Sequence, residues 1–186
     1  MKSFYTLLLS LASLLTSTYS VAQGSLAALE KKHGFRDAKV GMPFASFDIT
    51  PIKHYGEFHP GDYHIYYRLR DSKMLGDIPL AWIKYHFYKG YLKQISILAS
   101  YADKDAIIET LQTLYGPGEK TLNSYRLWES ANVGLLVHQA FEYVDGIPGI
   151  EIMYWSRSIN AQHLRDEEID IEKRHRMRIL NRQSDL

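Results

Sequence analysis

The fold is decided by residues 81–99, which read AWIKYHFYKGYLKQISILA. Apolar and polar side chains alternate along residues 81–88 and again along 91–99, which is the period of a half-buried β-strand. Lys89 and Gly90 between the two runs are typical of a two-residue hairpin turn. We therefore predict an antiparallel hairpin with one face turned to the core. Its expected core side chains are Ile83, Tyr85, Phe87, Ile95 and Ile97.

Outward from this hairpin, four more stretches have strand character and bring the predicted antiparallel sheet to about six strands. One precedes the hairpin, where Tyr63, Ile65, Tyr67 and Leu69 alternate with polar or basic residues. Three follow it and are separated by short polar or Gly/Pro-containing turns. These later stretches are residues 125–128, 133–144 and 150–157.

Helical spacing is clearest after the hairpin, where Ile107, Leu111, Leu114 and Tyr115 recur until Gly116 and Pro117 end the pattern. Shorter helices are predicted for residues 25–35 and 40–47, and a loop for residues 48–62. The order of helix, loop and strands occurs twice, which suggests a duplicated unit, although residue identity between the halves is poor. The prediction is one α+β domain, residues 23–159, with helices packed on one face of the sheet.

Residues 160–186 form a charge-dense C-terminal segment. Five acidic residues between Asp166 and Glu172 are followed by five basic residues between Lys173 and Arg182. Acid before base agrees with the helix dipole, and Asp170 with Arg174 is a favourable i, i+4 pair. The apolar residues form only a ragged stripe, so we predict a solvated surface helix that packs at one edge rather than a dedicated partner-binding helix.

The first 22 residues have the composition of a secretory signal peptide. Lys2 precedes an apolar stretch rich in leucine, and Ser20 and Ala22 place small residues where a signal peptidase reads them. We expect cleavage after Ala22 and a periplasmic or secreted mature chain. The stretch is too short for the roughly 20 apolar residues of a membrane span.

Composition excludes several classes of function. The chain has 22 Lys and Arg residues and 21 Asp and Glu residues. Removal of the signal peptide takes Lys2 with it and leaves 21 of each, so the mature chain lacks the basic excess of a general nucleic-acid-binding protein. The chain has no cysteine, which removes disulfides, thiol nucleophiles, thiolate metal sites and the lipid anchor of a bacterial lipoprotein. We expect no nucleic acid, no membrane span, no lipid anchor and no cofactor.

Three short motifs together resemble a known group of exported proteins. They are Val40-Gly41-Met42-Pro43-Phe44, the strand-turn-strand of residues 85–95, and Leu114-Tyr115-Gly116-Pro117 at a helix end. These features are similar to those of small, uncharacterised exported bacterial proteins with a domain like the SmpA/OmlA domain of outer-membrane assembly lipoproteins. The resemblance spans roughly residues 38–157, and it implies an α+β fold and a place in the bacterial envelope.

Enzyme chemistry has little support in the sequence. There is no Gly-x-Ser-x-Gly nucleophile elbow, and the carboxylate pairs lie at a turn or in the charged C-terminal segment. The exception is the histidine-rich stretch around residues 54–64, which could ligate zinc without thiolates but matches no established spacing. An alternative function is therefore a small periplasmic metal-dependent or hydrolytic enzyme. Its site residues would be His54, Glu57, His59 and His64.

The most distinctive pattern lies on the predicted non-core face of the sheet. Rings and cations interleave there, where a solvated face normally carries more Glu, Lys, Thr and Ser. Such a surface suits recognition of a protein or an anionic glycan, although cover by the C-terminal helix or by a loop would make it a second small core. The candidate binding residues are Tyr66, Arg68, Trp82, Lys84, His86 and Tyr88, with His64 beside them.

These observations favour a non-catalytic binding or structural module of the bacterial envelope, whose partner is another envelope or secreted protein. An inhibitor or immunity protein that docks on a secreted enzyme remains a further alternative. The sequence does not distinguish these partners or predict an oligomeric state.

Overall fold

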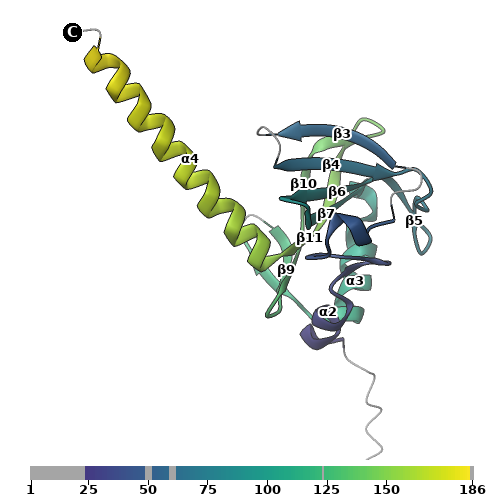
Figure 1. Ribbon diagram of the computed structural model, residues 1–186. Helices are drawn as coiled ribbons and strands as arrows, with labels where there is room; N and C mark the ends of the chain where they lie inside the picture. Colours follow the sequence, from purple (N-terminus) through teal and green to yellow (C-terminus); the bar gives the residue numbers. More distant parts are fainter. Residues whose placement is uncertain (1–23, 49–51, 59–61, 123, 185–186) are drawn as a thin grey trace, which may run out of the picture.

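The computed structural model describes residues 24–48, 52–58, 62–122 and 124–184. The predicted signal peptide and its cleavage site lie outside these residues. In the described chain, one short helix and a small ribbon precede a large antiparallel sheet, a second helix connects the two halves of the sheet, and a long helix follows it (Figure 1). The helices are α2 (Leu26–Lys32), α3 (Lys104–Tyr115) and α4 (Arg157–Ser184), with 3-10 turns η2 (Phe44–Ser46) and η3 (Tyr101–Asp103).

The large sheet confirms the predicted α+β class and the six predicted strands. Its strand order is β3-β4-β6-β7-β11-β10-β9-β8, with the short β5 paired to β6. Two edge strands, β3 and β8, extend it beyond the prediction. The bounds are β3 (Ile52–Phe58), β4 (Tyr63–Arg68), β5 (Met74–Leu75), β6 (Ile78–Tyr88), β7 (Tyr91–Ser100), β8 (Glu119–Thr121), β9 (Ser124–Glu129), β10 (Val133–Val144) and β11 (Ile147–Ser156).

The sheet consists of two four-stranded meanders. β3-β4-β6-β7 follow α2, β8-β9-β10-β11 follow α3, and the last strand of each meander pairs with the other at the centre of the sheet. The two halves of the chain therefore repeat the same organisation, helix first and meander second. This agrees with the duplicated unit that the sequence order suggests.

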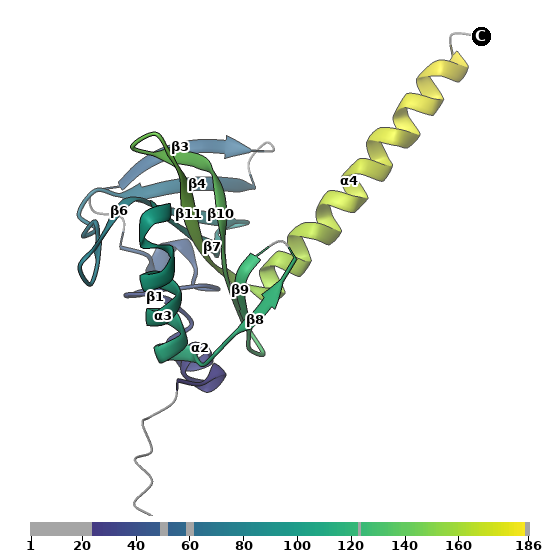
Figure 2. The ribbon, with the colours of Figure 1, turned by 180° about the vertical axis from the view of Figure 1, so that it is seen from behind.

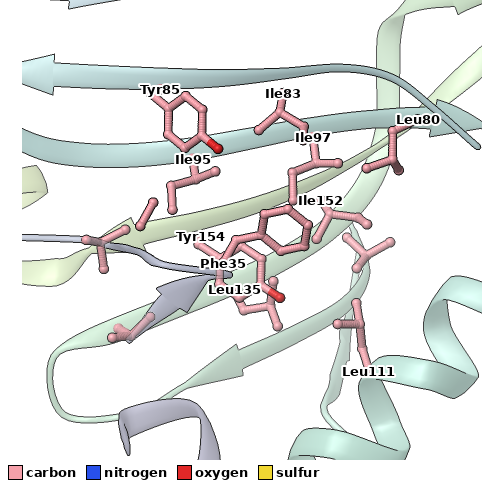
Figure 3. Close-up of a cluster of buried hydrophobic side chains, with 14 of the residues drawn as sticks. Phe35, Leu80, Ile83, Tyr85, Ile95, Ile97, Leu111, Leu135, Ile152 and Tyr154 are labelled. Atoms are coloured by element: carbon pink, nitrogen blue, oxygen red, sulfur yellow. The ribbon is translucent and has the colours of Figure 1, made fainter. Parts of the chain in front are cut away.

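The core lies on the face of the sheet that α2 and α3 cover, which we call the first face (Figure 2). The predicted hairpin is confirmed, since Ile83 pairs with Ile97 and Tyr85 with Ile95, and all four are buried. Figure 3 shows these side chains in one cluster with Phe35 of the small ribbon, and Leu111 of α3 lies at the far end of that cluster. That ribbon is formed by β1 (Gly34–Phe35) and β2 (Ala38–Lys39).

Three local predictions are wrong. The first helix ends at Lys32, because His33 takes a left-handed conformation with φ of 60° and the chain then enters the ribbon. The helix predicted for residues 40–47 is a single 3-10 turn, because Pro43 is held in a β-bridge to Tyr91. The predicted loop of residues 48–62 contains the edge strand β3, which pairs with β4 through a bulge at residues 54–56.

The opposite side of the sheet, the second face, is only partly covered. The first turns of α4 pack on β7 and β11, and the rest of the helix projects away from the body (Figure 1). The prediction of helices on one face therefore holds for α2 and α3, whereas α4 belongs to the second face.

Candidate binding surfaces and the root of the C-terminal helix

The six predicted binding residues do not share one face. Tyr66 on β4 lies directly opposite Tyr85 on β6, whose side chain is in the core, so Tyr66 and Arg68 point to the first face. The β6 candidates alternate with the core residues and point to the second face. They are Trp82, Lys84, His86 and Tyr88. The prediction of a single face is wrong. The alternation of side chains along a strand divides that strand into two faces, but it does not show which face of one strand lies beside which face of the next.

On the first face, Arg68 is bonded within the chain. Its guanidinium donates to both carboxylate oxygens of Asp37, at 2.6 and 2.9 Å, and to the hydroxyl of Tyr85 at 2.9 Å. It also pairs with Asp71 at 3.1 Å and lies 4.9 Å above the Phe47 ring. Burial would lower the pKa of Arg68, but hydrogen bonds to Asp37 and Tyr85 outweigh it and raise the pKa. This residue ties β4 to the N-terminal ribbon.

Tyr66 also packs inside the chain. Its ring centroid lies 5.0 Å from that of Phe44 and 5.8 Å from that of Phe87. These contacts join β4 to the 3-10 turn and to β6, so Tyr66 extends the core toward the edge of the sheet.

On the second face, Trp82 and Lys84 converge on one carboxylate from a distant strand. The Trp82 indole Nε1 and the Lys84 Nζ each donate to Glu142, both at 2.8 Å, and the ammonium lies over the indole ring. Glu142 lies in the irregular stretch of β10, between Gln139 and Tyr143, where the register to β11 shifts, and Gly149 brings the return strand close to Leu98. The β10–β11 hairpin thus curls over the second face, which buries the Lys84 side chain.

A buried polar cluster lies beside this pair. The His86 Nδ1 and the Tyr63 hydroxyl are 2.9 Å apart, and Glu151 lies 3.3 Å from His138. Burial lowers the pKa of His86 to about 4, with Lys84 and Lys93 acting in the same direction and Glu151 against it. Burial would raise the pKa of Glu151, but hydrogen bonds from His138 and Ser96 hold it below its usual value. At neutral pH this cluster therefore contains a neutral His86 and a charged Glu151.

The root of α4, which we define as His163 and Asp166 with their sheet partners, fixes the helix to the second face. The His163 ring stacks on Tyr63 at 5.4 Å and meets Tyr88 edge-on at 4.5 Å, and its Nδ1 is 2.8 Å from the Lys93 Nζ. One turn later, the Asp166 carboxylate accepts hydrogen bonds from the Tyr88 hydroxyl at 2.7 Å and the Lys89 Nζ at 2.9 Å. The hydrogen bond from Lys89 lowers the pKa of Asp166 most, and the hydrogen bond from Tyr88 lowers it further.

Beyond the root, α4 has no cover from the described body. Every described side chain from Glu168 to Asn181 is exposed, including several large apolar ones. The predicted solvated helix is confirmed in that respect, but it projects from the sheet instead of lying along an edge. In the described chain no helix is long and apolar enough to cross a membrane. The exposed apolar residues of α4 are Leu164, Ile169, Ile171, Met177, Ile179 and Leu180.

An acidic cleft of about 340 Å³ opens between α4 and the turns at the ends of β4, β6 and β7. Carboxylates predominate on its walls, and Ile169 adds an apolar contact. The lining includes Asp62, Lys89, Asp166, Glu167, Asp170 and Lys173.

The alternative histidine site is only partly visible. The His54 and His64 rings lie 5.6 Å apart on neighbouring strands, and Glu57 is placed opposite His64 in the ladder. His59 lies outside the described residues. Among the residues that are described, no group of three or more His, Asp or Glu side chains has metal-binding geometry.

Sequence reasoning missed the partners that complete the second face. Glu142, His163 and Asp166 meet β6, and His163 also meets Lys93 on β7, across separations of up to 78 residues along the chain. The sequence gives no local signal for such contacts, because they depend on the curl of one hairpin and the direction in which α4 leaves β11.

No family model, curated protein or solved structure matches this chain. The resemblance to SmpA/OmlA-like domains stays a prediction.

Proposed function

We propose that this protein is an exported, non-catalytic binding module of the bacterial envelope, with α4 as the element that contacts its partner. In this proposal the signal peptide is removed after Ala22 and the mature chain acts in the periplasm or outside the cell. The partner is another envelope or secreted protein.

One observation carries the proposal, namely a helix held firmly at its root and exposed along the rest of its length. A polar helix without tertiary contacts is marginal in water, and exposed Ile, Leu and Met side chains gain free energy when a partner covers them. The contacts of His163 and Asp166 fix the direction in which the helix leaves the body. A helix oriented in this way loses less conformational freedom on binding than a free tail would.

The second face of the sheet is less suited to this role than the sequence implied. Lys84, Trp82 and Tyr88 already use their polar groups on Glu142 and Asp166. A partner would have to replace these bonds, whereas the apolar side chains of α4 beyond its root face solvent. We therefore assign the binding role to α4 and a positioning role to the second face.

The test compares the proteins that two immobilised chains recover from an envelope extract. One is the full mature chain, and the other ends after Asp170. The truncated chain keeps the root contacts, so circular dichroism and the unfolding transition serve as controls for its fold. We expect one specific protein that the full chain recovers and the truncated chain does not. Equal recovery on both chains, or no specific recovery on either, would overturn the assignment to α4.

A further inference from the structure

The charges of α4 divide it into two oppositely charged halves. Between Asp166 and Glu172 there are five carboxylates, and between Lys173 and Arg182 there are five basic side chains. Two such helices side by side in parallel would place like charges together. In the antiparallel arrangement each acidic half lies against a basic half.

One face of α4 is itself acidic in its first half and basic in its second half, and its residues have the spacing of a helix–helix contact. Its residues recur every three or four positions, which places them on one side of the helix. The acidic end carries Asp166 and Asp170 around Ile169, and the basic end carries Lys173 and Arg176 beside Met177 and Leu180. We call this set the cleft-side face, because its acidic end lines the acidic cleft.

We propose that the cleft-side face binds the α4 helix of a second copy of this chain, antiparallel, in a two-fold symmetric dimer. With Lys173 near the symmetry axis, Asp170 lies against Arg176 of the second copy, and Ile169 lies against Met177. The same two contacts form twice, since a two-fold interface is self-complementary. The two Lys173 ammonium groups then lie near each other at the axis and oppose association, and the two flanking Asp170–Arg176 contacts offset this repulsion. The basic end of each helix then approaches the acidic cleft of the other copy.

The opposite face of α4 fits this arrangement less well. It presents Leu164, Ile171 and Ile179 with Glu168 and Glu172 as its acidic residues, and it points away from the acidic cleft. Ile179 and Leu180 are therefore a matched pair, because they are adjacent, similarly exposed at 45% and 52%, and lie on different faces.

The paired length predicts a weak dimer. The contact from Asp166 to Leu180 extends about 22 Å along the axis, and contacts of this size bury less than stable dimer interfaces do. We expect dimerisation in the micromolar range that weakens as salt screens the charges.

The experiment is sedimentation velocity of the full mature chain over a concentration series, with charge-reversal variants. Asp170→Lys and Arg176→Glu each place like charges together twice per dimer, so each should weaken self-association about tenfold or more. Mixing the two variants should restore association, because both contacts of the heterodimer are then complementary.

Leu180→Glu should weaken the dimer, and Ile179→Glu should leave it within about twofold of the wild type.

A monomeric wild-type chain at all concentrations would overturn the proposal, as would equal effects of the Leu180 and Ile179 substitutions. So would two variants that stay monomeric when mixed. Circular dichroism of each variant controls for loss of helix, since Asp170 also pairs with Arg174 within α4. The pairing rests on the proposed role of α4 in binding, but a monomer that still loses its envelope partner on truncation would refute only the pairing.

Discussion

At the residue scale, His86 shows how the second face differs from an ordinary solvated sheet surface. Its ring is buried, its Nδ1 lies 2.9 Å from the Tyr63 hydroxyl, and in the described chain its Nε2 has no hydrogen-bond partner. The loss of water opposes a charge on the ring most strongly, and the ammonium groups of Lys84 and Lys93 add to this effect, while Glu151 acts against it. The fold therefore holds His86 neutral at a pH where an exposed histidine is already partly protonated.

This burial predicts a specific pH dependence of stability. The pKa of His86 is about 4 in the folded state against 6.5 for a free histidine, so between these values the unfolded chain binds the proton and the folded chain does not. The His86 contribution is constant above pH 6.5, and stability falls as the pH drops from 6.5 to 4, by up to about 3 kcal/mol. Urea unfolding at pH 7 and pH 5 should show a smaller loss for His86→Gln than for the wild type.

His138 acts in the opposite direction, because Glu151 raises its pKa. The comparison between wild type and His86→Gln isolates the His86 contribution from this background. An identical loss of stability in both chains on going from pH 7 to pH 5 would show that His86 is protonated, and therefore solvated, in the folded protein.

At the scale of elements, the pairing of β10 with β11 depends on a glycine. Gly134 lies directly opposite Trp155, and a Cβ at this position would overlap the indole ring. Strand periodicity predicted both strands, but not which glycine lies beneath an aromatic ring. That information comes from the register, which the turn at the other end of the hairpin sets.

We expect Gly134→Ala to destabilise the protein by about 1–3 kcal/mol, because the Trp155 ring must leave its position over the strand. Urea unfolding of Gly134→Ala, Trp155→Ala and the double variant measures the coupling between the two positions. In the Trp155→Ala background the glycine substitution should cost little. If it costs the same in both backgrounds, the indole is not the cause.

At the scale of the whole molecule, the sequence predicted the parts with local signals. The hairpin around Lys89 and Gly90 and the helix ending at Gly116 are correct, because turn chemistry and periodicity are local. The sequence does not predict the strand β3, because Pro51 and Gly56 are residues that commonly interrupt strands. A glycine at a β-bulge is nevertheless compatible with an edge strand. Which face of β4 lies beside which face of β6 depends on how the two strands pair across the chain between them. For that reason the six predicted binding residues lie on two faces of the sheet instead of one.

The molecule as a whole divides into a folded body and a helix that the body holds only at its root. A chain that ends after Asp170 keeps His163 and Asp166, so its unfolding free energy should stay within about 0.5 kcal/mol of the full chain. A chain that ends after Asn160 loses both residues and leaves the buried Lys93 without His163. We expect this shorter chain to be less stable by about 1–3 kcal/mol.

Urea unfolding followed by tryptophan fluorescence, at protein concentrations low enough to prevent self-association, distinguishes the two truncations. The helical signal in far-ultraviolet circular dichroism should fall in both chains, while the unfolding midpoint should fall clearly only in the shorter one. This difference follows from the structure, because the first turns of α4 pack on β7 and β11, whereas the described side chains from Glu168 to Asn181 are exposed. A large loss of stability on truncation after Asp170 would mean that the exposed half of α4 packs on the body, and it would remove the basis for assigning that half to a partner.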